Sequence, residues 1–267
     1  MAILTISREF GSGGREIGEA VARELGYAYV DKERLHEEIR KAGHDWEKWS
    51  RTLDEHCPTV WERHDWSFRG FGALLQSVLL EFASADRVVL MGRGGNFLLQ
   101  GIPYSLSVRV VAPLEQRLER IMKRESVDRE TARWLAEKTD ASRACFIQTI
   151  YGQTWNDPAN FDMTIDTADS PIGDIVAMLT QTLARRDTLN TSDAREELGL
   201  RAVAARVRAA IATDPAFFVP VMDVFVQDKS IVLRGVVHTP KEHRRIEDAA
   251  RTIAGDVPVR CELHYRG

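Results

Sequence analysis

The chain has 267 residues, of which 44% are hydrophobic and 28% charged, and its formal net charge is -4. These values are typical of a globular protein with one large domain or two ordinary ones. A net charge this small gives no indication of a general nucleic-acid-binding protein, which would usually be basic, so we expect no nucleic-acid partner.

The sequence also bears on the cellular compartment. No apolar run reaches the roughly 18 residues of a membrane-spanning helix, so we do not expect a membrane protein. The N-terminus lacks a charged segment followed by a long apolar stretch, which argues against a signal peptide. Cys57, Cys145 and Cys261 lie far apart without metal-ligand spacing. They favour unpaired thiols in a reducing compartment, and we therefore expect a cytoplasmic protein.

The first 186 residues alternate between strand-like apolar runs and helix-like amphipathic stretches. Strands separated by helices indicate a parallel sheet with both faces covered, so residues 1–186 predict an α/β domain with a sheet sandwiched between helices. The expected strands are residues 2–7, 27–31, 87–91, 105–111 and 163–166. The expected helices are residues 17–25, 32–41, 68–84, 113–123, a pair within 128–150, and 171–186.

A glycine-rich loop, SREFGSGGREIG at residues 7–18, separates the first strand from the first helix. Backbone N–H groups of such a loop can point at phosphate oxygens, and the helix adds the positive end of its dipole, so the loop favours phosphate binding. A dinucleotide site, which Asp31 would suit, fits less well because Glu16 stands where GxGxxG needs its third glycine. A tight turn without a ligand is the third interpretation.

The rest of the chain has a different pattern. Residues 187–198 are polar and poor in large apolar residues, which predicts a linker with a short helical end. Residues 199–267 follow the order α-β-β-α-β, which predicts a separate small α+β domain. Its expected elements are a helix at 202–212, strands at 224–226 and 231–237, a helix from the capping box at Thr239 to Gly255, and a strand at 259–265.

Five segments of the first domain, in this order, resemble the cytidylate kinase-like group of P-loop nucleoside monophosphate kinases. They are ITISREFGSGGREIG with LGYAYVDKERL, VVLMGRGG, PLEQRLERIMKRE, EKTDASRACFIQTIYG and FDMTIDT, and they cover residues 1 to about 184. The resemblance implies a P-loop NTPase-type sheet and a phosphotransferase that uses ATP and Mg²⁺. The implied acceptor is a nucleoside monophosphate, with a pyrimidine base expected.

The resemblance also implies which residues bind the donor nucleotide. The nucleotide-binding loop would consist of Gly11, Ser12, Gly13, Gly14, Arg15 and Glu16. Arg120 and Arg124, where the lid starts, would contact the donor base and the γ-phosphate. Arg143, in the D-x-x-R pattern of the helix that returns from the lid, would clamp the transferring group. Arg15, Arg124 and Arg143 would therefore be the catalytic residues.

The acceptor side is implied in the same way. Asp31 and Arg93 would line the acceptor site, with Arg93 pairing the phosphate or the base. Residues 32–84 would form the acceptor-binding insert, whose tryptophans favour a role in its own core over stacking on a base.

Three positions depart from the usual P-loop pattern. Arg15 stands in place of the loop lysine and keeps the charge without the compact geometry of an ammonium group. Glu16 replaces the hydroxyl residue that usually binds Mg²⁺, and Met91 ends the third strand where many of these kinases have an acidic residue. The metal ligands are therefore left unassigned.

The C-terminal segments VFVQDKSIVLRGVV and VPVRCELHYR, with Gly235 as the expected glycine, resemble a BON-type domain. The resemblance implies a regulatory or homo-oligomerisation module, or one that binds a lipid or a small ligand. Two other hypotheses stay open for the chain. One is a catalytically weak nucleotide sensor whose C-terminal domain reports occupancy, and the other is a small-molecule kinase with a non-nucleotide acceptor.

Overall fold

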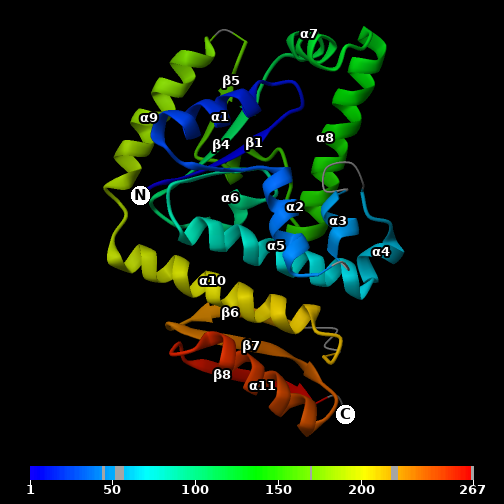
Figure 1. The fold of residues 1–267 in the computed structure, drawn as a ribbon, viewed down its shortest axis with the longest axis vertical. Helices are drawn as coiled ribbons and strands as arrows, with labels where there is room; N and C mark the ends of the chain where they lie inside the picture. Colours follow the sequence, from blue (N-terminus) through cyan, green and yellow to red (C-terminus); the bar gives the residue numbers. More distant parts are fainter. Residues whose placement is uncertain (44–45, 52–56, 169, 218–221, 266–267) are drawn as a thin grey trace.

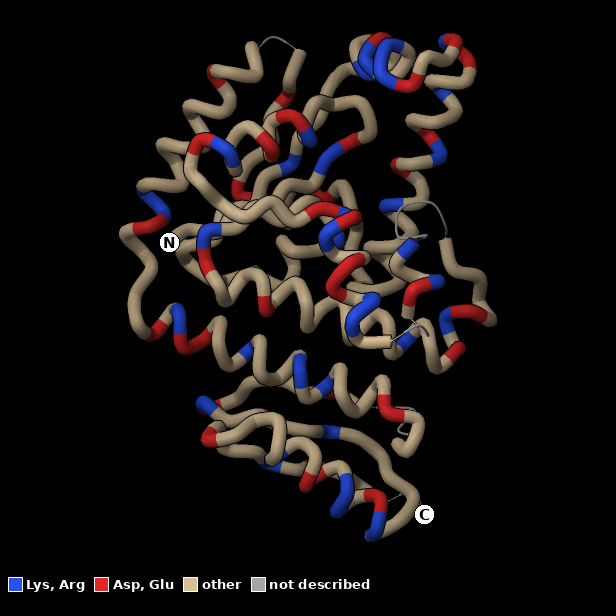
Figure 2. Tube along the Cα trace, in the orientation of Figure 1, with Lys and Arg blue, Asp and Glu red and all other residues tan. Residues whose placement is uncertain are grey.

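The computed structural model describes residues 1–43, 46–51, 57–168, 170–217 and 222–265. Figure 1 shows an α/β unit stacked on a smaller sheet, with one long helix between them. Figure 2 shows acidic and basic positions interspersed along the helices of both units, in keeping with the small net charge.

The centre of the larger unit is a parallel sheet with the strand order β2-β3-β1-β4-β5. Its strands are β1 (Ile3–Arg8), β2 (Ala28–Val30), β3 (Val88–Met91), β4 (Ser105–Val111) and β5 (Met163–Asp166). The predicted parallel sheet is thus confirmed. Because every neighbouring pair is parallel, the carboxyl ends of the strands and the loops that follow them meet at one edge of the sheet.

Helices cover both faces of this sheet (Figure 1). On one face, α1 (Gly14–Leu25) and α9 (Ile172–Asp187) bury Ile17 and Leu179 against the strands. The other face carries α2 (Lys32–Lys41), α5 (Trp66–Ser84) and the short α6 (Gly95–Leu98). Here Leu35 and Leu75 join one apolar core with Ile3 and Leu90 of the sheet.

Between α2 and α5 lie α3 (Glu47–Arg51) and α4 (Val60–His64). Trp46 and Trp49 are buried in the core around α5, which confirms the expected core role for these two tryptophans. Trp61 on α4, by contrast, is 86% exposed.

The segment that the resemblance assigns to the lid consists of α7 (Leu114–Glu125) and α8 (Arg129–Tyr151). The expectation of two helices within 128–150 is wrong, because α8 is continuous. Asp128 caps its start by accepting a hydrogen bond from the N–H of Thr131, and Gly152 ends it in a left-handed conformation. The segment has no glycine or proline in its interior that could interrupt the helix.

Most of the expected linker is helical. Residues 188–191 separate α9 from α10 (Ser192–Thr213), whose first turn Thr191 caps. The N-terminal half of α10 buries Leu198 in the core around α5, and the C-terminal half buries Val207 in the core of the small unit. The helix is therefore shared by both units, which the expected helix at 202–212 did not foresee.

The small unit adds β6 (Met222–Gln227), β7 (Ser230–Val237), α11 (Pro240–Ala254) and β8 (Val259–Tyr265) to α10. Strand β7 lies in the middle, antiparallel to β6 and parallel to β8. Helix α11 begins at Thr239, which accepts a hydrogen bond from the N–H of Glu242 as the capping box predicts. Together these elements confirm the predicted αββαβ order.

Two of the three cysteines are joined. Cys57 and Cys145, which the sequence predicted as unpaired thiols, form a disulfide with their Cα atoms 5.6 Å apart. The two cysteines are 88 residues apart in the sequence, and only the packing of the insert against α8 brings them together, so their spacing did not indicate a disulfide. Cys261 is a free thiol, as expected.

Within the described parts of the chain, we find no helix that combines the length and the apolar character needed to cross a membrane.

Candidate functional site

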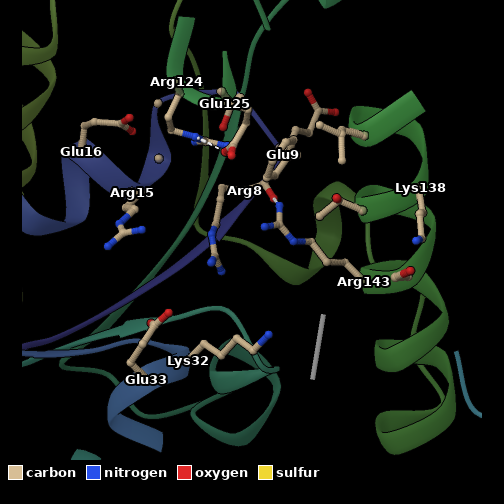
Figure 3. A pocket seen from close by; sticks show the side chains of 18 residues that line it. Arg8, Glu9, Arg15, Glu16, Lys32, Glu33, Arg124, Glu125, Lys138 and Arg143 are labelled. Atoms are coloured by element: carbon tan, nitrogen blue, oxygen red, sulfur yellow. Dashed lines mark hydrogen bonds and ion pairs between the residues drawn. The ribbon is translucent and has the colours of Figure 1, made fainter. Parts of the chain in front are cut away.

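A cavity of ≈ 730 Å³ opens where β1 ends, between the glycine-rich loop, the start of α2 and the lid (Figure 3). Its lining includes all six positions predicted for the nucleotide-binding loop, together with Arg124 and Arg143. Its lining residues are Arg8, Glu9, Phe10, Gly11, Ser12, Gly13, Gly14, Arg15, Glu16, Lys32, Glu33, Arg124, Glu125, Leu135, Lys138, Thr139, Ser142 and Arg143.

The loop needs its glycines for conformation and for space. Gly11 and Gly13 have φ values of +81° and +83°, which side chains rarely adopt. A Cβ atom on Gly11 would lie 2.8 Å from the carbonyl oxygen of Arg117, and one on Gly14 would lie 2.7 Å from Cβ of Arg8. The backbone thus approaches its neighbours closely and begins α1, whose positive end faces the cavity.

Arg120 is linked to this loop through Thr167. Its guanidinium donates hydrogen bonds to Oγ1 of Thr167 at 2.7 Å and to the carbonyl oxygen of Thr167 at 3.1 Å. Thr167 in turn donates to the carbonyl oxygen of Ser12 at 2.8 Å. Arg120, which the resemblance assigned to the donor base, is not among the described residues that line the cavity.

Asp140 connects the loop to both lid helices. It accepts a hydrogen bond from the N–H of Phe10 at 2.9 Å and pairs with the buried guanidinium of Arg117 on α7. Asp140 also lies 3.7 Å from Nη1 of Arg143, one turn further along α8. The D-x-x-R pattern therefore places Arg143 by means of its own carboxylate.

Two cations of the lid share the ring of Phe10. The guanidinium carbon of Arg124 lies 4.7 Å from the ring centroid, and that of Arg143 lies 5.8 Å from it. Arg124 also pairs with Glu125 at 2.8 Å, and Arg143 donates to the carbonyl oxygen of Arg8 at 2.8 Å. Figure 3 shows the side chain of Arg143 extending from α8 toward Arg8, while the side chain of Arg8 points toward the lower part of the view. Both residues line the cavity and give it a positive region suited to phosphate.

Arg15 and Glu16 are both exposed and point in different directions in Figure 3. Arg15 donates to Glu19 at 2.8 Å, one turn along α1. This hydrogen bond raises the pKa of Arg15 above its ordinary value. The cation that replaces the loop lysine is thus paired within its own helix.

The two residues that the resemblance assigned to the acceptor site lie beside the cavity. Asp31 caps α2 by accepting from the N–H of Arg34 at 3.1 Å, and the next residues, Lys32 and Glu33, line the cavity in its place. Arg93 is 4% exposed, with a left-handed φ of 59°, and borders a small hollow that also touches Arg8 and Arg143.

Sequence reasoning missed Arg8, Lys32 and Lys138 as cavity residues. Arg8 is the last residue of β1, and ligands of open parallel sheets bind at the carboxyl ends of strands, so this rule could have identified it. Lys138 precedes Ser142 by one helical turn on α8, so both face the cavity. The same rule of strand ends points to Lys32, which lies two residues after the end of β2 at Val30.

Oxygen ligands for a hard cation are present in the cavity. The carboxylates of Glu16, Glu33 and Glu125 line it. The hydroxyl of Ser12 is fully buried in the loop and has no hydrogen-bond partner within the described part of the chain. No group of three or more His, Cys, Asp or Glu residues forms a preassembled metal centre among the residues described. Met91 is buried in the core, and its sulfur lies 2.7 Å from a Cβ built on Gly18.

The comparisons agree with this geometry. Residues 3–169 match the model of the cytidylate kinase-like family, and residues 200–267 match that of the BON domain. A cytidylate kinase from Methanocaldococcus jannaschii is 28% identical over 169 residues, which is 62% of this chain and 88% of that protein. A cytidylate kinase from Pyrobaculum aerophilum is 27% identical over 179 residues, 66% of this chain and 89% of that protein.

Among solved structures, an uncharacterized protein from Eubacterium ventriosum superimposes with a TM-score of 0.55 at 20% identity. The match covers 69% of this chain and 99% of that one, and it shows a shared fold. With the parallel sheet, the glycine-rich loop at the end of β1 and a family match over residues 3–169, the chain belongs to the cytidylate kinase-like family and carries a C-terminal BON domain.

Proposed function

We propose that this protein is a phosphotransferase that moves the γ-phosphate of ATP to a nucleoside monophosphate, with a pyrimidine nucleotide such as CMP as the expected acceptor. The observation that carries the proposal is that one cavity gathers the glycine-rich loop with Arg8, Arg124 and Arg143. Phosphoryl transfer depends mainly on positioning and on neutralising charge, and this cavity offers both.

Each part of the cavity would contact a different part of the reacting phosphates. The backbone N–H groups of residues 11–14 and the start of α1 would hold the donor phosphates. Arg124 enters from α7 and would neutralise the γ-phosphate. Arg143, which is held by Asp140 and by the carbonyl of Arg8, would contact the phosphoryl group during transfer.

Magnesium fits the oxygen-rich lining. Glu16 and Glu33 are the residues that would hold it, directly or through water, because Mg²⁺ prefers carboxylate and water ligands. When bound, Mg²⁺ neutralises charge on the donor phosphates. The same ion would relieve the repulsion between the carboxylate of Glu16 and the phosphates.

The acceptor would occupy the side of the cavity formed by α2. Lys32 is the cation placed there, and Arg93 lies behind it at the hollow next to Arg8. Asp31, Arg93 and Arg120 remain proposals for substrate contact. A cytoplasmic location is proposed from the use of ATP alone, because the Cys57–Cys145 disulfide removes the support that unpaired thiols would have given it.

The test is ADP production from ATP and Mg²⁺ with CMP, dCMP, UMP, AMP and GMP as separate acceptors. We expect turnover with at least one pyrimidine monophosphate. In Arg143→Gln, kcat should fall about 100-fold or more, because a charged donor to the transition state is lost. ATP affinity should change much less, since Arg143 acts on the transferring group.

The matched control is Arg133→Gln. Arg133 lies on the same helix, pairs with Glu115 at 3.8 Å and does not line the cavity, so its loss should leave kcat within about twofold. Absence of turnover with every monophosphate, under Mg²⁺ and Mn²⁺, would refute the proposal.

One observation favours the second candidate, a nucleotide sensor. Arg15, in the place of the loop lysine, is exposed and paired with Glu19. A sensor would bind ATP tightly without producing ADP and would change its association state on binding, through the BON domain. Calorimetry combined with size-exclusion chromatography distinguishes it from the kinase.

A further inference from the structure

A second cavity, of ≈ 310 Å³, lies between α4, α5, α8 and α10 and shares no lining residue with the first. Four helices form it. Arg63 comes from α4, Arg69 and Gln76 from α5, Gln148 from the last turn of α8, and Arg208 from α10. Arg208 stands outside residues 3–169, the part of the chain that matches the kinase family. The cavity therefore joins the kinase unit to the helix it shares with the BON domain.

The lining of this second cavity is strongly positive. Three arginines from three different helices border it, and its lining contains no Asp or Glu within the described part of the chain. Arg208 is half-buried and donates to Oε1 of Gln76 at 3.0 Å. Burial lowers the pKa of Arg208, and nearby Arg69 adds to this effect, whereas the exposed carboxylate of Asp223 opposes it. An anion among these arginines would offset the cost of burying Arg208.

The remaining surface suits an organic molecule. The amide of Gln148 and the hydroxyl of Thr149 can exchange hydrogen bonds with hydroxyl groups of a ligand. Phe68 and Ile150 add an apolar wall. A volume of this size falls at the lower end of the range of small-molecule sites and leaves room beyond a bare inorganic anion.

We infer that this second cavity binds a small phosphate monoester, with its phosphate between Arg63, Arg69 and Arg208 and its organic part against Phe68 and Ile150. Arginine is the side chain best suited to bidentate contact with phosphate, and three of them approach from different directions. This site is separate from the first cavity, at the end of β1, and a ligand can occupy it without catalytic turnover.

The test is isothermal titration of the full-length protein with ribose 5-phosphate, with ribose as the uncharged counterpart. We expect binding of ribose 5-phosphate and none of ribose. Arg69→Gln and Arg208→Gln should each weaken binding about tenfold or more, the loss expected when a charged hydrogen-bond donor is removed. The control, Arg206→Gln, removes the same charge from an exposed position of α10 outside the cavity and should leave binding within about twofold.

Ribose 5-phosphate could also bind in the first cavity, and the variants distinguish binding there from binding in the second cavity. If ribose 5-phosphate bound only in the first cavity, its affinity would be equal in the wild type and in the Arg69→Gln, Arg208→Gln and Arg206→Gln variants, and this result would overturn the inference. Absence of binding to the wild type at about 10 mM would overturn it as well. If Arg208→Gln fails to fold, the exposed Arg63 and Arg69 still permit the test, because their side chains can be changed with little effect on packing.

Discussion

At the scale of single residues, Gly92 determines where Arg8 can lie. Gly92 follows β3 with a φ of +72°, and a Cβ atom there would be 2.4 Å from Nη1 of Arg8. The guanidinium of Arg8 therefore occupies the space that any side chain at position 92 would need.

We expect Gly92→Ala to displace Arg8 and to strain the turn after β3. Strain of this kind costs about 1–3 kcal/mol, and misplaced phosphate-binding groups should lower kcat/KM by about 10–100-fold. Steady-state kinetics and urea denaturation measure the two effects. Gly199→Ala is the control, because no atom lies within 4 Å of an added Cβ and alanine favours helix α10. Unchanged kinetics in Gly92→Ala would show that the position of Arg8 is unimportant.

Some positions of single residues in the site could be predicted from the sequence, and others could not. The motif positions around the loop and the D-x-x-R pattern correctly indicated that Gly11–Glu16 and Arg143 come together, because short motifs encode local geometry. Arg120 and Arg124 are one helical turn apart, a spacing that places both on one face of a helix, and the resemblance assigned both to the donor nucleotide. Instead, Thr167 provides two hydrogen-bond acceptors for Arg120, a tertiary contact that no local spacing reveals.

At the scale of elements, α10 has apolar residues on more than one side. Leu198 is 1% exposed in the core around α5, and Val207 is fully buried in the core of the BON domain. Sequence patterns identify helices by a single apolar stripe, so a helix that packs on two partners is recognised only in part. The strands, each a compact apolar run, were predicted to within two residues.

We expect Leu198→Ala to lower the free energy of unfolding by about 2–5 kcal/mol, because it leaves a cavity between α10 and α5. Urea denaturation followed by circular dichroism measures this change. The exposed Arg206→Ala on the same helix should change stability by less than about 0.5 kcal/mol. A loss below about 1 kcal/mol in Leu198→Ala would mean that the two helices pack loosely.

At the scale of the whole molecule, the disulfide joins the segment before α4 to α8, the helix that carries Arg143. Closing a separation of 88 residues restricts the unfolded chain. On the chain-entropy account, reduction with dithiothreitol should cost up to about 4.6 kcal/mol and lower the melting temperature. Cys57→Ser should show the same loss without reductant and no further loss with it.

Thiol counting checks the pairing. Burial raises the pKa of Cys261 to about 11, so at pH 8 the native protein should react slowly with a disulfide reagent and faster as the pH rises toward this value. Unfolding without reductant should expose one thiol, and unfolding after reduction should expose three. Three thiols without reductant would contradict the disulfide.

Because α10 belongs to two cores at once, the kinase and BON units are not interchangeable modules. A chain cut at residue 186 would leave the face of α5 that Ala194, Leu198 and Ala202 cover exposed to water. A chain that began at residue 214 would lose Ala204, Val207 and Ile211 from the small core. Recombination between relatives could therefore replace the BON sheet only if the new domain brought a helix that fits α5. Substitutions on α10 must thus remain compatible with both units.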